Sequence, residues 1–111
     1  MNPIPLRLVQ TGQAPAWLSL APVASAIRLW VELPGIGRAL ACQTPPDAER
    51  VRTAWPLLRV AEASAVVAQR IDDAGHLIDE RRIGAASLAL VFGADVAEMV
   101  SLRLAAHGLA A

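Results

Sequence analysis

The chain is poor in the side chains that carry most enzyme chemistry. Its 111 residues include no lysine, no tyrosine, one cysteine and two histidines, while ten arginines supply all the strong cations. So few bases, nucleophiles and metal ligands leave most catalytic schemes incomplete in a single copy. Cys42 has no second cysteine to pair with, which fits a reducing cytoplasm. We therefore expect a cytoplasmic protein with no cofactor and no metal, whose function comes from its surface and assembly.

Net charge and an unbroken apolar run are also missing. The ten arginines are balanced by five aspartates and five glutamates, which weighs against nucleic acid or anionic lipid as a partner. Residues 8–27 are uncharged, but polar residues at 10–13 and prolines at 15 and 22 interrupt them, so we expect no membrane span. A cleaved signal peptide stays open, because Arg7 precedes the apolar stretch and Ala24-Ser25-Ala26 resembles a cleavage site.

Apolar residues, by contrast, are in excess. They make up 55% of the chain before glycine is counted, and 23 of them are alanines. Alanine tolerates a surface, and its abundance together with arginine in place of lysine suggests a GC-rich bacterial source. A domain of this size has limited interior, so the remaining excess predicts burial against another subunit. We expect a homo-oligomer or an accessory subunit of a larger assembly.

The N-terminal half predicts an arm, a hairpin and a helix. Residues 1–25 lack helical or strand periodicity and read as an extended arm, followed by a domain over 26–111. Alternation over 26–33 predicts a strand, and Pro34-Gly35 a turn that sets Leu29 against Leu40 and Ile27 against Cys42, with Val31 facing Arg38. Thr44 is the expected cap of a helix that begins at Pro45 and kinks or ends near Pro56.

The C-terminal half predicts a second hairpin, a short strand and a helix. Asp73-Ala74-Gly75 suits a three-residue loop that places Ile71 opposite Leu77, followed by an exposed charged edge strand. Residues 87–92 are compatible with a buried strand, although the segment is too short to exclude a helix. Asp95 and Glu98 mark the start of a last helix, and His107-Gly108 its end.

These elements predict one α+β domain. Its antiparallel or mixed sheet has four to five strands, with two helices packed on one face. A ferredoxin-like topology is one candidate.

One local motif resembles a known family. Leu33-Pro34-Gly35-Ile36-Gly37 followed by Ala41 is similar to the hairpin of helix-hairpin-helix DNA-binding modules. The resemblance implies that backbone N–H groups near Gly35 and Gly37 contact a phosphate without reading the base sequence. Pro45 and Pro46 depart from the pattern, and a Pro-Gly turn between two strands explains the same residues.

Candidate binding residues lie on the first strand, the arm and the last helix. Trp30 falls on the polar side of its strand, where it is either an interface anchor or covered within the chain, with Trp17 as a possible neighbour. Arg103 and His107 project onto the apolar arc of Val96, Met99, Val100 and Leu104. We expect them either to lie at the solvated helix end or to reach a carboxylate on a partner or an anionic ligand.

Two further hypotheses concern catalysis and metal. A small enzyme would need a site shared between subunits, built from Arg103, His107 or the acidic turn around Asp72 and His76. That turn matches no metal motif, and a solvated hairpin accounts for it. The leading hypothesis is a non-catalytic protein.

Overall fold

Two β-hairpins lie side by side and form one antiparallel sheet. The structure is a computed structural model that describes residues 23–109. The first hairpin consists of β1 (Ala26–Leu33) and β2 (Gly37–Gln43), and the second of β3 (Val66–Ile71) and β4 (Leu77–Arg82). The strand order is β2-β1-β3-β4, with antiparallel pairing throughout. The two central strands are therefore the first strands of the two hairpins.

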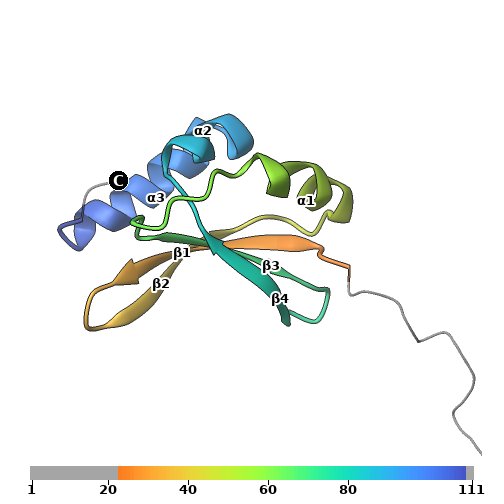
Figure 1. The fold of residues 1–111 in the computed structure, drawn as a ribbon, viewed down its shortest axis with the longest axis horizontal. Helices are drawn as coiled ribbons and strands as arrows, with labels where there is room; N and C mark the ends of the chain where they lie inside the picture. The colour runs from red at the N-terminus through yellow and green to blue at the C-terminus, as the bar shows by residue number, and fades with distance from the viewer. Residues whose placement is uncertain (1–22, 110–111) are drawn as a thin grey trace, which may run out of the picture.

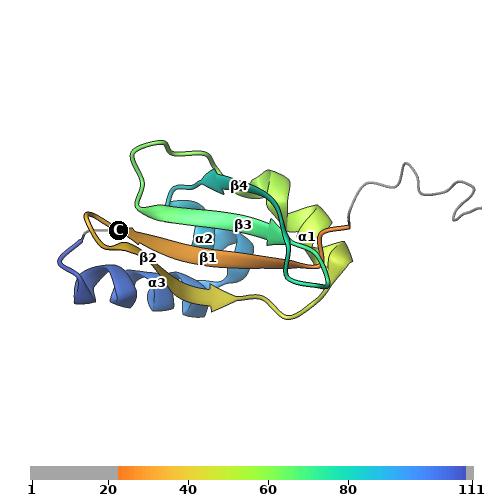
Figure 2. The same ribbon diagram turned by 90° about the horizontal axis from the view of Figure 1, so that it is seen from below.

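Helices cover one face of this sheet and leave the other open (Figures 1 and 2). They are α1 (Ala48–Ala54) with the 3-10 helix η3 (Trp55–Leu57), then α2 (Ala86–Phe92) and α3 (Ala94–Ala106). Side chains from the covered face, such as Leu29 and Val31, pack against Leu88, Val100 and Leu104 in the core. The expected single α+β domain is confirmed, with four strands and three α-helices.

The predicted strand over residues 87–92 is wrong, since this segment is α2. A strand would have buried Leu88 and Leu90 on one side, whereas Leu88 is buried and Leu90 is 90% exposed. The helix instead groups Leu88 with Val91 and Phe92 at helical spacing against the core. The hairpin-helix-hairpin-helix order also differs from the strand-helix-strand-strand-helix-strand order of a ferredoxin-like fold.

The first hairpin is confirmed, but its predicted register is wrong. The turn uses three residues, and Leu33 pairs with Gly37 while Val31 pairs with the small Ala39. Arg38 consequently pairs with Glu32 on the open face. A bulge then shifts the register between Leu29 and Trp30, so that Leu29 pairs with Cys42. The conflict between Val31 and Arg38 in the predicted pairing is thus removed.

The first helix starts later than the sequence suggested. The cap is Asp47, whose Oδ1 accepts a hydrogen bond from the Arg50 N–H at 3.1 Å. Thr44 is used elsewhere, because its Oγ1 accepts the Ile27 N–H at 3.0 Å and ties the chain to β1. The predicted end near Pro56 is confirmed, since α1 gives way to η3 there.

The second hairpin and the end of the last helix follow the predictions, but that helix begins at Ala94 after Gly93 and has no side-chain cap from Asp95. Ile71 pairs with Leu77, and Gly75 takes a positive φ of 85° in the loop. The charged β4 is an edge strand. The last helix ends at Ala106 and is followed by His107 as its C-cap and by Gly108 in a left-handed conformation. Most of the predicted arm lies outside the described residues, but Ser25 is hydrogen-bonded to Ile71 and Asp47 through backbone groups.

Candidate interaction surfaces

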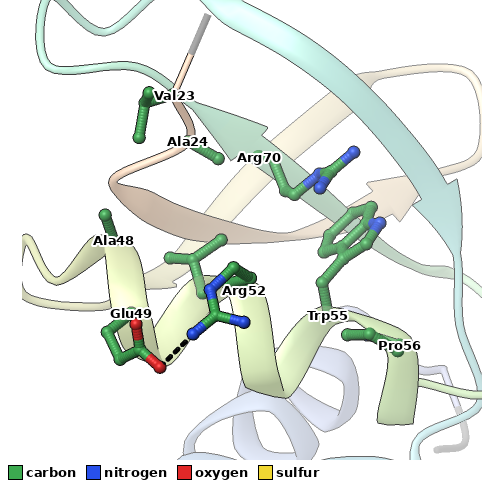
Figure 3. Close-up of a pocket in the computed structure, with 9 residues that line it drawn as sticks. Val23, Ala24, Ala48, Glu49, Arg52, Trp55, Pro56 and Arg70 are labelled. Atoms are coloured by element: carbon green, nitrogen blue, oxygen red, sulfur yellow. Dashed lines mark hydrogen bonds and ion pairs between the residues drawn. The ribbon is translucent and has the colours of Figure 1, made fainter. Parts of the chain in front are cut away.

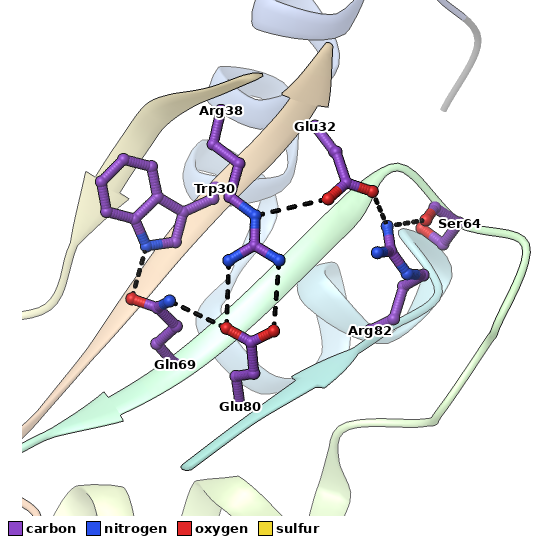
Figure 4. A network of polar contacts seen from close by, with 7 residues as sticks. All are labelled: Trp30, Glu32, Arg38, Ser64, Gln69, Glu80 and Arg82. Carbon is purple, nitrogen blue, oxygen red and sulfur yellow. Dashed lines mark hydrogen bonds and ion pairs between the residues drawn. The ribbon is translucent and has the colours of Figure 1, made fainter. Parts of the chain in front are cut away.

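Trp30 lies on the open face of the sheet, as the alternation of β1 predicted. It is half-buried, and its register partners are Leu40 on β2 and Val67 on β3. The indole Nε1 donates a hydrogen bond to Oε1 of Gln69 at 2.8 Å (Figure 4). The ring is therefore held in place by its own chain while part of its surface stays accessible. Its role as an interface anchor remains a prediction.

A network of paired charges surrounds Trp30 and crosses all four strands (Figure 4). Arg38 on β2 donates two hydrogen bonds to the Glu80 carboxylate on β4, at 3.0 and 3.1 Å. Glu32 on β1 accepts from Arg38 at 3.4 Å and lies 2.6 Å from Arg82. Gln69 on β3 links the indole to Glu80. The open face is thus organised by contacts within one chain.

These contacts fix the protonation of the carboxylates. Hydrogen bonding from Arg82 lowers the pKa of Glu32, and hydrogen bonding from Arg38 lowers the pKa of Glu80. Both groups therefore stay ionised at neutral pH and make poor general acids there. The face offers paired charges beside exposed Leu40 and Leu77.

A groove of about 350 Å³ lies between α1 and the start of the described chain (Figure 3). Its inner wall is Trp55, which is 4% exposed and lies against the guanidinium groups of Arg70 and Arg81, at 4.9 and 4.6 Å from the ring centroid. Arg70 also pairs with Asp79, and Arg81 donates to the Trp55 carbonyl at 3.2 Å. These arginines hold the packing of α1 on the sheet.

This arginine pair was not predicted from the sequence. Alternation over β3 and β4 places Arg70, Asp79 and Arg81 on the helix-covered face. Trp55 could have indicated the two arginines, because a large aromatic ring on a helix that covers the sheet attracts cationic side chains to its face.

The outer surface of α3 brings Arg103 and His107 together. They line a shallow groove of about 310 Å³ with Met99, Leu102 and Ala106. The expected apolar arc is only partly correct. Val100 and Leu104 are buried, but Met99 is 46% exposed, and both Arg103 and His107 are exposed.

The same helix carries its acids at the opposite end. Asp95 and Glu98 are exposed near the N-terminal end, whereas Arg103 and His107 are exposed near the C-terminal end. Within residues 23–109, none of these four side chains takes part in an ion pair. The exposed surface of α3 therefore carries acidic and basic side chains at its two ends.

The remaining sequence candidates have structural roles or lie outside the described chain. Gly35 lies in the turn between β1 and β2, and Gly37 is the first residue of β2, so the helices that flank this motif in helix-hairpin-helix modules are replaced by β1 and β2. Asp72 Oδ1 accepts the N–H groups of Ala74 and His76 at 2.9 and 2.8 Å, which closes its turn. Trp17 falls outside the described residues.

Comparisons with known proteins add no functional assignment. No family model matches the chain, and no curated protein or solved structure is detectably similar to it. Over residues 23–109, no three histidine, cysteine, aspartate or glutamate side chains are grouped as a metal site would require. No helix in that range has the length and apolar character needed to cross a bilayer.

Proposed function

We propose that this protein is non-catalytic and acts by assembling with further copies of itself. The supporting observation is the exposure of large aliphatic side chains across the described surface. They include Val23, Ile36, Leu40, Leu57, Val60, Leu77, Leu90, Met99 and Leu102. Single exposed residues are normal on a monomer, but α3 combines two of them with unpaired charges in one groove. Burial between copies would remove this apolar surface from water.

The state of the titratable groups supports a non-catalytic role. Glu32, Asp79 and Glu80 form structural ion pairs with arginines. Burial raises the pKa of the Cys42 thiol, which keeps it protonated and weakly nucleophilic at neutral pH. Catalysis within one copy would therefore need groups from elsewhere. A bacterial cytoplasm is the proposed setting, because it suits the alanine and arginine bias and the lone thiol.

Light scattering after size exclusion, at two loading concentrations, tests this function. We expect a mass near twice the 11.7 kDa of one chain, or a larger multiple, that falls on dilution. A mass of 11.7 kDa at both concentrations would refute self-association. The proposal would then be replaced by its alternative, an accessory subunit that binds a different protein.

A further inference from the structure

We propose that α3 pairs with the α3 of a second copy in antiparallel orientation about a two-fold axis. This inference rests on the proposed self-association and names its interface. The observations that carry it are the shape of the outer face of α3 and the opposite charges at its two ends.

The side chains on the outer face of α3 form the ridges and the groove that helix packing requires. With 3.6 residues per turn, Leu102 lies opposite the midpoint of the buried Val100 and Leu104, so it points directly away from the core. Residues four apart form ridges on a helix. One ridge runs through Met99, Arg103 and His107, and a second through Leu102 and Ala106. The groove between these two ridges can accept a ridge of another helix.

The charges select the orientation of the partner. In a parallel pair the acidic ends, with Asp95 and Glu98, would meet each other, as would the basic ends. In an antiparallel pair the acidic end of each helix lies against the end of the other helix that carries Arg103 and His107. A two-fold axis produces this contact twice, so one sequence is complementary to itself.

The size of the surface predicts a modest affinity. A helix of 13 residues is about 20 Å long, so a pair of such helices buries less area than the roughly 1,600 Å² of a standard interface. We therefore expect a dimer that dissociates on dilution and weakens with added salt, because the charged contacts lie at the rim.

Two charge-reversed variants test the pairing. The first, Asp95→Arg with Glu98→Arg, makes the outer face of α3 basic, and the second, Arg103→Glu with His107→Glu, makes it acidic. At low salt, each variant alone should have the mass of a monomer where the wild type is a dimer. An equimolar mixture should recover the dimer mass, because opposite faces then meet. Arg50→Glu on the exposed surface of α1 is the matched control and should dimerise as the wild type does.

The outcomes distinguish a failure of the α3 pairing from a failure of the self-association on which it rests. If the wild type dimerises and both variants do so equally well, the interface lies elsewhere and only the α3 pairing fails. The pairing also fails if two folded variants do not associate when mixed. A monomeric wild type removes the proposed function together with this inference. Because reversal of Asp95 can weaken the start of α3, the single variant Arg103→Gln, which removes the charge without placing an anion in the last turn, provides a second reading, with weaker dimerisation expected at unchanged helical content.

Discussion

Trp55, at the C-terminal end of α1, joins that helix to two arginines of the sheet. It is 4% exposed, and two guanidinium groups lie against its ring. Trp55→Ala should lower the free energy of unfolding by about 3–5 kcal/mol, as for other large buried aromatics. Urea denaturation measures this cost, with Trp30→Ala as the comparison. We expect a smaller loss there because Trp30 is half-buried, and equal losses would contradict the role given to Trp55.

The charge network of the open face predicts a dependence of stability on pH. Because the hydrogen bond from Arg38 lowers the pKa of Glu80 from its ordinary value of 4.5, the unfolded chain binds more protons in acid. The contribution of this group is complete above pH 4.5 and is lost as the pH falls through the lowered value.

Glu80→Gln should therefore reduce the loss of stability between about pH 5 and about pH 3. Denaturation midpoints at several pH values measure this slope. Glu62→Gln, at an exposed position outside the network, is the control and should keep the slope of the wild type. A Glu80→Gln slope as steep as that of the wild type would show that the Arg38 contact does not hold in solution.

At the scale of elements, the cap of α1 is Asp47 and not the predicted Thr44. Asp47→Ala should cost about 1 kcal/mol of stability, because the Arg50 N–H loses its acceptor in a helix of only seven residues. Asp47→Asn should be nearly neutral, since an amide oxygen also caps. Thermal unfolding of the two variants checks this, and an equal loss for both would remove Asp47 as the cap.

The elements that the sequence predicted well are those with strong local signals. The loop at Gly75 and the end of the last helix depend on turn chemistry and were placed correctly. The Thr44 cap was wrong because its hydroxyl bonds to β1, which lies 17 residues away in the chain. Residues 87–92 were wrong because a short apolar run has no period of its own, and packing against α3 decides its form.

The sequence predicted the positions of the candidate residues on their elements, but it did not predict their contacts. Alternation put Trp30 on the outer side of β1, yet its bond to Gln69 depends on β1 pairing with β3, which local sequence does not determine. Helical spacing linked Arg103 with His107, but it could not tell which side of α3 faces the sheet. That side follows from the packing of Val100 and Leu104.

At the scale of the whole molecule, the open face of the sheet and the outer face of α3 differ in how their charged side chains are paired. The open face of the sheet carries charges that are paired across all four strands. The outer face of α3 keeps both its charges and its apolar side chains exposed. The chain has surplus apolar residues and no net charge. We therefore propose that its copies associate through the outer face of α3, where charged and apolar side chains are both exposed.

Sedimentation equilibrium of two leucine variants tests this account most directly. Leu102 on α3 and Leu57 on η3 are 63% and 62% exposed, so their replacement by serine removes equal surface from two different places. The account predicts that Leu102→Ser raises the dimer dissociation constant by at least about tenfold, as expected for a buried leucine, while Leu57→Ser leaves it unchanged. Dissociation constants equal to that of the wild type for both variants would contradict the claim that α3 joins the copies.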